Sequence, residues 1–510
     1  MSEIQTEYIT IDENDIDEEL ISRAAELIAN GGLVAFPTET VYGLGANALD
    51  GEAAAKIYEA KGRPSDNPLI VHISKPDELE RIALEVPQKA KVLAEKFWPG
   101  PLTIILAKQP DIPDTTTGGL DTVAIRCPSN EIARRLIIES GGPIAAPSAN
   151  RSGRPSTTRF SHVREDLDGR VDMIIDGGDS VIGLESTIVD LSGGAPVILR
   201  PGYITADELS EVLGEPVRES ASGDGGAPKA PGMKYRHYSP KGELILVTGA
   251  TISDVVRCIN VFAKRAIDEG RTPGIVATSD TRERYRCGRV LDIGSPTDDE
   301  AIAAALYDVL RQFDSIGAEI IYVEYTFGGR LKDALDNRLM KASGGRVLKA
   351  PSPVYSTNRR NIIFVDSHGN ARSAMAAVLF SRLYEGNNIV SFPRGIVVQF
   401  PEPLNQKTEA VMVSNGLPTQ GYVSAQLQDS EITPSTMIVA MEERDRRQVI
   451  AKFPSANENN TVVLSEFVGD ELEIMDPYGG NLQAYGICFE VIRSSVQKMA
   501  DILSEEGAMI

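Results

Sequence analysis

The chain has 510 residues, 42% of them hydrophobic and 24% charged, and carries a formal net charge of -22 at pH 7. This length predicts about three domains rather than one continuous core. The acidic balance argues against a membrane partner or strong direct nucleic-acid binding, so any anion site has to be a local cationic pocket.

The cysteines and the N-terminus bear on the cellular compartment. The four cysteines lie far apart with no CxxC pair, which argues against a disulfide framework or a zinc site. The N-terminus lacks the basic and apolar regions of a signal peptide, and no apolar run reaches membrane-spanning length. We therefore expect a cytoplasmic protein.

Residues 1–214 predict a first domain of mixed α/β type. Apolar residues recur at helical spacing from Asp17 to Asn30, and two glycines stop this helix before a strand at 33–36. Interleaved strands and helices then continue to the end of the domain. Strands are expected at 102–107, 122–125, 173–175 and 187–190, and a helix at 90–97.

Residues 215–241 predict a linker, because proline, serine and glycine dominate its first part. Its last part contains Tyr235, Arg236, His237 and Tyr238, and such side chains are unusual in a simple tether. They could fold over an occupied pocket as a lid. Alternatively, they pack onto the nearest domain.

Two further α/β domains are expected after the linker. In residues 242–350, short buried strands alternate with helices, which predicts a Rossmann-like parallel sheet. In residues 359–510, a strand at 362–365 is followed by a glycine-bearing loop and a helix. Backbone N–H groups at such a helix start can bind an oxyanion.

Lys61 and Arg63 form the most informative pair of the first domain. Gly62 and Pro64 favour a turn, in which Lys61 supplies a point charge and Arg63 a planar fork suited to phosphate or carboxylate. Other polar segments could converge on them in the fold, although each alone is also typical of a turn or a surface ion pair. These segments are 37–43, 122–126, 146–153, 185–187 and 199–202.

The ordered motifs resemble a known family. PTETVYGLG, KGRPSDNPL, APSANRSG, ESTIVD and LRPG resemble the YrdC-like domain of L-threonylcarbamoyladenylate synthases, and PGMKYRHYSP resembles the linker of their long form. Residues 334–346 resemble the end of the C-terminal domain of these enzymes. The resemblance implies that L-threonine, bicarbonate and ATP give threonylcarbamoyl-AMP and diphosphate, for N6-threonylcarbamoyladenosine in tRNA.

The resemblance also implies roles for single residues. Lys61 and Arg63 are expected to catalyse by positioning and charge neutralisation, because both reacting groups belong to substrates. The expected ATP-binding residues are Lys61, Arg63, Thr122, Ser148, Asn150, Ser156, Arg200, Tyr235 and His237. The expected threonine-binding residues are Thr38, Asn67, His72, Arg126, Ala146 and Ser186. We expect Mg²⁺ to accompany ATP without a tightly bound metal, and the tRNA threonylcarbamoyl-transfer machinery to act downstream.

The last domain resembles low-molecular-weight protein phosphatases, in which a cysteine six positions before the loop arginine attacks phosphorus. Arg372, Ser373 and Asp476 match that family's pattern, whereas Asp366 stands at the cysteine position. We therefore expect a degenerate phosphatase site without cysteine-type turnover. Because carboxylates accept phosphoryl groups in other enzymes, the substitution by itself does not exclude covalent chemistry at Asp366. An anion sensor, a docking surface and a structural scaffold remain open as its role.

Two other functions fit part of the sequence. One is an RNA-binding module of the same tRNA-modification pathway without adenylate synthesis, against which the net charge argues. The other is a transferase that uses carbamoyl-phosphate. The chain has no acylphosphatase-like or zinc-finger segment of the kind that accompanies that use.

Overall fold

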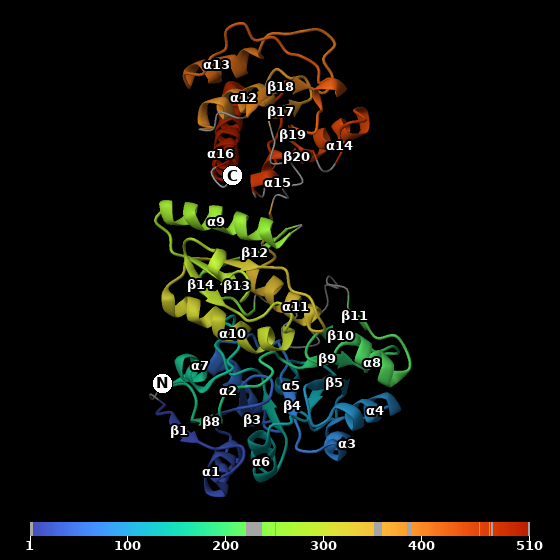
Figure 1. The fold of residues 1–510 in the computed structure, drawn as a ribbon. Helices are drawn as coiled ribbons and strands as arrows, with labels where there is room; N and C mark the ends of the chain where they lie inside the picture. Colours follow the sequence, from blue (N-terminus) through green and yellow to red (C-terminus); the bar gives the residue numbers. More distant parts are fainter. Residues whose placement is uncertain are drawn as a thin grey trace. The chain divides into compact units, whose positions relative to one another are not determined.

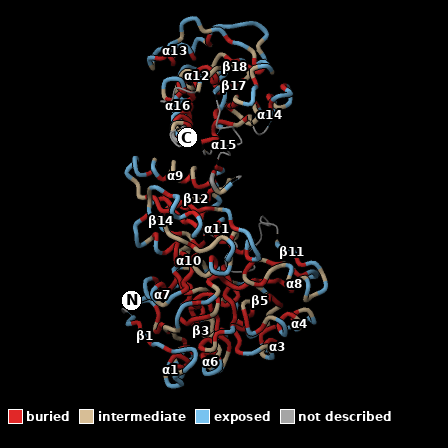
Figure 2. The backbone as a smooth tube through the Cα atoms, in the orientation of Figure 1, coloured by how far each residue is buried: buried red, intermediate tan, exposed pale blue. Residues whose placement is uncertain are grey.

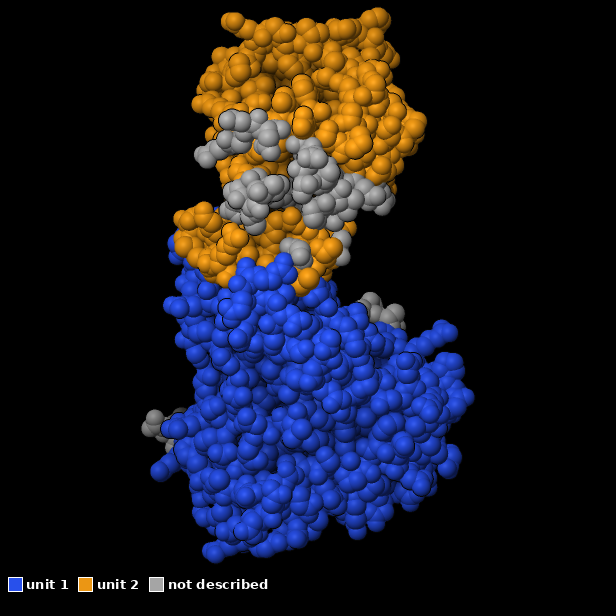
Figure 3. Space-filling view, viewed as in Figure 1, with its two compact units in different colours: residues 1–246, 269–284, 288–346 blue, residues 247–268, 285–287, 347–510 orange. Residues whose placement is uncertain are grey.

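The computed structural model describes residues 4–220, 237–249, 251–350, 360–384, 389–457, 460–468, 470 and 473–507. The chain divides into two compact units (Figure 3). Unit 1 comprises residues 1–246, 269–284 and 288–346, and unit 2 comprises residues 247–268, 285–287 and 347–510. Unit 1 thus joins the first predicted domain to most of the second.

An eleven-stranded sheet forms the larger part of unit 1. It is mixed, because β1 pairs with β8 in parallel while β2 and β3 are antiparallel. The expected mixed sheet is thereby confirmed. In sheet order the strands are β1 (Glu7–Thr10), β8 (Met173–Asp176), β2 (Val34–Phe36), β3 (Gly43–Asn47), β7 (Ile144–Ala146), β4 (Ile70–His72), β6 (Thr122–Arg126), β5 (Leu102–Ala107), β9 (Thr187–Asp190), β10 (Val197–Arg200) and β11 (Arg218–Glu219).

Helices pack on both faces of this sheet (Figure 1). Helix α1 (Glu18–Ala29) begins where the Asp17 side chain accepts hydrogen bonds from two backbone N–H groups, and its buried residues Ile21, Ala24 and Ile28 face the core. The remaining helices are α2 (Gly51–Lys61), η1 (Pro76–Glu78), α3 (Leu79–Ile82), α4 (Gln88–Phe97), α5 (Asp114–Thr117), α6 (Glu131–Glu139), α7 (Phe160–Leu167) and α8 (Ala206–Leu213).

A second sheet of unit 1 has the strand order β14-β13-β15-β12. Strand β13 pairs in parallel with both β14 and β15, which confirms the predicted parallel sheet. The elements are β12 (Glu243–Thr248), β13 (Pro273–Ala277), η2 (Arg282–Arg284), β14 (Arg289–Asp292), α10 (Asp299–Ile316), β15 (Ile320–Glu324) and α11 (Lys332–Ser343).

Unit 2 contains a four-stranded, all-parallel sheet of order β18-β17-β19-β20. Helices α12 and α16 pack against each other beside it, and their buried aromatic residues include Phe380 and Phe489. The elements are α9 (Ile252–Asp268), β16 (Val347–Lys349), β17 (Asn361–Asp366), α12 (Arg372–Leu383), β18 (Val390–Gly395), α13 (Gln406–Ser414), η3 (Asp429–Glu431), β19 (Thr436–Ala440), α14 (Glu443–Lys452), β20 (Thr461–Val463), α15 (Leu464–Val468) and α16 (Leu482–Gly507).

Burial follows the sheets in both units (Figure 2). The central strands are buried along their length, whereas β11 is exposed and lies inside the segment predicted as a linker. Within the described ranges, no helix is both long and apolar enough to cross a membrane.

Candidate functional site

A cavity of about 50 Å³ lies in unit 1 where the ends of several strands meet. We call it the Lys61 cavity. Its walls come mainly from residues at or next to the ends of β2, β3, β4, β6, β7, β9 and β10, from the end of α2, and from the last part of the predicted linker. Its lining residues are Thr38, Thr40, Val41, Tyr42, Gly43, Lys61, Arg63, Ile70, His72, Arg126, Ala146, Pro147, Ser148, Asn150, Ser152, Ser156, Glu185, Ser186, Arg200, His237 and Tyr238.

Of the predicted ATP- and threonine-binding residues that the structure describes, all but Thr122 and Asn67 therefore line one cavity. Thr122 begins β6 while Arg126 ends it, so roughly 13 Å separates them along the strand. Asn67 lies behind Arg63, and its carbonyl oxygen accepts from Arg63 Nε at 3.3 Å. Tyr235 lies outside the described residues. The ligand-binding roles of all these residues remain predictions.

Lys61 is the last residue of α2 and is 3% exposed. Its Nζ donates to the backbone carbonyls of Ser148 and Asn150. Burial, and then the nearby charge of Arg63, hold the pKa of Lys61 well below its ordinary value. The ammonium group has only neutral oxygens as hydrogen-bond partners in the described part of the chain, so an anionic ligand would relieve its desolvation.

Arg63 reaches the cavity because α2 ends in a tight turn. Gly62 has a φ of 64°, a left-handed conformation that glycine adopts readily, and Arg63 N–H then donates back to Tyr58 O at 2.9 Å. The Arg63 guanidinium donates to the carbonyl of Pro68 at 3.1 Å. Burial lowers the pKa of Arg63 to about 10, and Arg200 acts in the same direction.

Arg126 is a further cation that lines the cavity, at the end of β6. Arg126 Nη2 lies 2.7 Å from Glu39 Oε1, but without hydrogen-bond alignment. Arg126 Nε and Nη2 are buried, and among the described residues neither has a hydrogen-bond partner. Two adjacent unsatisfied N–H donors match the geometry of a carboxylate.

Another part of the cavity wall is held by residues of the second sheet domain. Tyr307 Oη and Arg338 Nε donate to Glu185 Oε2 at 2.9 and 3.1 Å, and Arg338 also donates to the Glu185 and Pro201 carbonyls. These contacts fix the loops that carry Ser186 and Arg200, which are themselves joined by a hydrogen bond of 3.2 Å.

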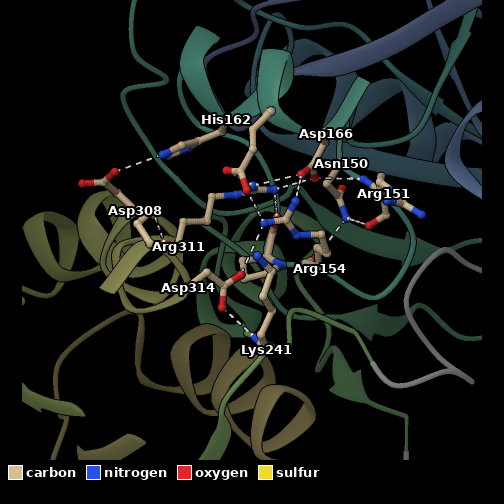
Figure 4. A network of polar contacts seen from close by, with 12 residues as sticks. Asn150, Arg151, Arg154, His162, Asp166, Lys241, Asp308, Arg311 and Asp314 are labelled. Atoms are coloured by element: carbon tan, nitrogen blue, oxygen red, sulfur yellow. Dashed lines mark hydrogen bonds and ion pairs between the residues drawn. The ribbon is translucent and has the colours of Figure 1, made fainter. Parts of the chain in front are cut away.

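A second network supports the loop that carries Asn150 and Ser156 (Figure 4). Arg311 Nη2 of α10 donates to Asp166 Oδ2 at 2.8 Å, and the same oxygen accepts from Arg151 N–H at 3.0 Å. The Asn150 side-chain amide donates to the carbonyls of Arg151 and Arg154. Helix α10 thus braces this side of the cavity too.

The last part of the predicted linker enters the cavity wall. Tyr238 stacks on Tyr307 with ring centroids 5.4 Å apart, and its φ of 65° is rare for a residue with a side chain. Ser239 fixes the segment further by donating to Gly153 O and Ala342 O. Burial lowers the pKa of His237 to about 3, so its ring is neutral near pH 7.

Sequence reasoning assigned no role to Arg311, Tyr307 and Arg338. A signal existed for Arg338, which lies in the stretch 334–346 that resembles the family, but its partner Glu185 is far away in sequence. In the described ranges, no group of three or more His, Cys, Asp or Glu side chains is placed to hold a metal ion.

The degenerate phosphatase residues come together in unit 2. Asp366 ends β17, and Arg372 and Ser373 begin α12. Arg372 Nη2 lies 3.5 Å from Asp476 Oδ2. We call residues 366–373 the Asp366 loop.

Three family models match the chain. A model described as telomere recombination covers residues 26–202, the C-terminal domain of threonylcarbamoyl-AMP synthase covers 204–344, and low molecular weight phosphotyrosine protein phosphatase covers 361–509. With the fold and the cation-lined cavity, these matches define an enzyme of the YrdC-like class joined to a phosphatase-like domain.

Individual relatives agree with the models. Threonylcarbamoyl-AMP synthase of Pyrococcus abyssi is 48% identical over 338 residues, which span 66% of this chain and 97% of the relative. The Bacillus subtilis enzyme is 46% identical over 340 residues, with coverages of 66% and 97%. The crystal structure of P. abyssi Sua5 complexed with L-threonine is 47% identical, with a TM-score of 0.64 and coverages of 68% and 99%. The chain belongs to the threonylcarbamoyl-AMP synthase family, as its motifs predicted.

Proposed function

We propose that this chain makes L-threonylcarbamoyl-AMP and diphosphate from L-threonine, bicarbonate and ATP, for the N6-threonylcarbamoyladenosine modification of tRNA. The observation that carries the proposal is a single cavity lined by several cationic side chains. These are Lys61, Arg63, Arg126 and Arg200. Such a cavity suits two anionic substrates that have to react with each other.

The anionic groups of both substrates can pair with cations that line the cavity. The threonine carboxylate would accept from Arg126 Nε and Nη2, and this bidentate contact would orient the amine. The phosphates of ATP would face Lys61, Arg63 and Arg200, with Mg²⁺ carried by the phosphates sharing their charge. Because Glu185 already accepts hydrogen bonds from Ser156, Tyr307 and Arg338, it is a poor candidate for a metal ligand.

The reaction needs no nucleophilic side chain. The threonine nitrogen bonds to the carbon of bicarbonate with loss of water, giving a carbamate. A carbamate oxygen then attacks the α-phosphorus while the bond from this phosphorus to the β-phosphate oxygen breaks and diphosphate leaves. The protein positions the two groups, neutralises charge and excludes water.

The size of the cavity implies a conformational step. A volume of about 50 Å³ holds one or two water molecules, whereas binding sites for small-molecule ligands and cofactors commonly measure several hundred Å³. The His237–Tyr238 segment, which lines the cavity, is the part we expect to move when ATP enters. Its return would protect the labile product until the tRNA threonylcarbamoyl-transfer machinery takes it.

The test is diphosphate release from ATP with threonine and bicarbonate present, or with either one omitted. We expect release to require both, and Lys61→Ala to abolish most of it. Lys56→Ala is the matched control, because Lys56 lies on the same helix and also donates to a backbone carbonyl, but does not line the cavity. Release that is indifferent to threonine would contradict the proposal.

A further inference from the structure

The Asp366 loop of unit 2 already holds an anion, and that anion is the side chain of Asp366. Backbone N–H of His368 donates to Asp366 Oδ1 at 3.0 Å, and N–H of Ser373 donates to Oδ2 at 2.8 Å. N–H of Gly369 donates to Oδ1 as well. The N–H groups at the start of α12 therefore converge on a carboxylate that is only 3% exposed.

The cation of the loop is also committed within the chain. Arg372 is 1% exposed and donates to Glu442, to the carbonyl of Ile474 at 2.6 Å, and to Asp445 Oδ2 at 3.3 Å. It also lies 3.5 Å from Asp476. Burial opposes its charge, yet the surrounding acids raise the pKa of Arg372 above its ordinary value. Its donors face carboxylates and a carbonyl on several sides.

We infer that Asp366 is a built-in ligand of this loop, which keeps the loop closed to phosphate and phosphate esters. A phosphate oxygen would need the same N–H groups that the carboxylate occupies. An incoming dianion would also enter a site where Asp366, Glu442, Asp445 and Asp476 surround one arginine, so like charges would repel it.

A loop closed by Asp366 excludes two of the roles that the sequence left open for this domain. A phosphoryl acceptor has to lie beside its phosphate, but the Asp366 carboxylate fills the position that the phosphate would take. The loop is therefore neither an aspartate-dependent phosphatase nor a phosphate sensor. The substitution leaves the fold intact because the aspartate satisfies buried N–H groups that would otherwise lack partners.

The test measures the binding of inorganic phosphate to the full chain by calorimetry and by the shift of the melting temperature. Asp366→Ala removes the built-in carboxylate, and we expect it to add a phosphate site with on the order of 100-fold tighter binding than the wild-type loop. Asp429→Ala is the matched control, since Asp429 accepts hydrogen bonds from Ser455 elsewhere in the same unit. Phosphate bound in the Lys61 cavity would be common to all three proteins and cancels in the comparison.

Two results would overturn the inference. One is wild-type phosphate binding that Arg372→Met abolishes, because it would place phosphate in an open loop. The other is a folded Asp366→Ala protein that gains no phosphate site. If Asp366→Ala does not fold, Asp366→Ser replaces it, because serine also removes the carboxylate and leaves room for phosphate, and the absence of a gain is then equally decisive.

Discussion

The Lys61 cavity and the Asp366 loop are both places where the chain buries cations at the ends of strands, and they differ in what surrounds those cations. Lys61 and Arg63 donate to neutral carbonyl oxygens. Arg372 is enclosed by Glu442, Asp445 and Asp476. Among the described residues, Lys61 and Arg63 have no carboxylate as a hydrogen-bond partner, whereas Arg372 has three carboxylates around it. A cationic motif therefore becomes a site for an external anion only when the protein does not itself supply a carboxylate partner for the cation.

The largest effect is expected for Arg338, which pairs with Glu185, a carboxylate of the Lys61 cavity wall. Arg338→Met would leave Glu185 buried without its cation, and we expect a loss of about 3–5 kcal/mol in the free energy of unfolding of unit 1. Urea unfolding measures the loss.

The matched control is Arg330→Met. Arg330 pairs with Glu208 and Glu300 and its side chain is 34% exposed, so about 0–1 kcal/mol is expected. Equal losses for the two variants would mean that the Glu185 pair has no special weight. Adding Glu185→Gln to Arg338→Met should recover part of the loss, because the unpaired charge is then removed.

Substitution of Arg63 tests whether the cations of the Lys61 cavity contact the substrate. Arg63→Ala should reduce kcat/KM for ATP by the equivalent of about 1.5–3 kcal/mol, since a charge-assisted contact to phosphate is lost. Arg81, which is exposed and does not line the cavity, supplies the control as Arg81→Ala. If the Arg63 substitution leaves the kinetics unchanged, Arg63 does not contact the phosphates of ATP.

The strands of the fold could be predicted from the sequence only in part. Strands with continuous apolar runs, such as β5, were predicted because the run itself is the signal. The short strands β3 and β7 were missed, since glycine and alanine in a few residues carry little strand preference.

Sequence motifs identified the site residues, but contacts between residues far apart in the sequence determine which of these side chains are paired. The cations Lys61 and Arg63 were found because charge beside a glycine turn is local information. The pairing of Arg338 with Glu185 joins positions 153 residues apart, and no local pattern predicts it. The replacement at Asp366 was visible in the sequence, but the three N–H groups that its carboxylate accepts from became visible only in the fold.

Burial of a histidine in unit 1 and of an aspartate in unit 2 predicts opposite pH dependence of stability between pH 4 and 6. Burial, and then Arg126, lower the pKa of His72 from 6.5 to about 3. The unfolded imidazole binds a proton in this range and the folded one does not, so unit 1 loses stability as the pH falls. Burial, and then Glu442 and Asp366, raise the pKa of Asp445 from 3.8 to about 6 against the opposing effect of Arg372. Here the folded state holds the extra proton, so unit 2 gains stability as the pH falls.

Hydrogen exchange at pH 4.5 and 6, followed separately in peptides of β4 and β17, measures the two trends. Each group can contribute at most about 1.4 kcal/mol per pH unit, and His237, whose pKa is also lowered to about 3, adds to the trend of unit 1. His72→Asn should flatten the dependence in β4 and leave β17 unchanged, while Asp445→Asn should do the reverse. Parallel slopes in the two units would contradict the two pKa shifts, because burial of a base and burial of an acid give linkage of opposite sign.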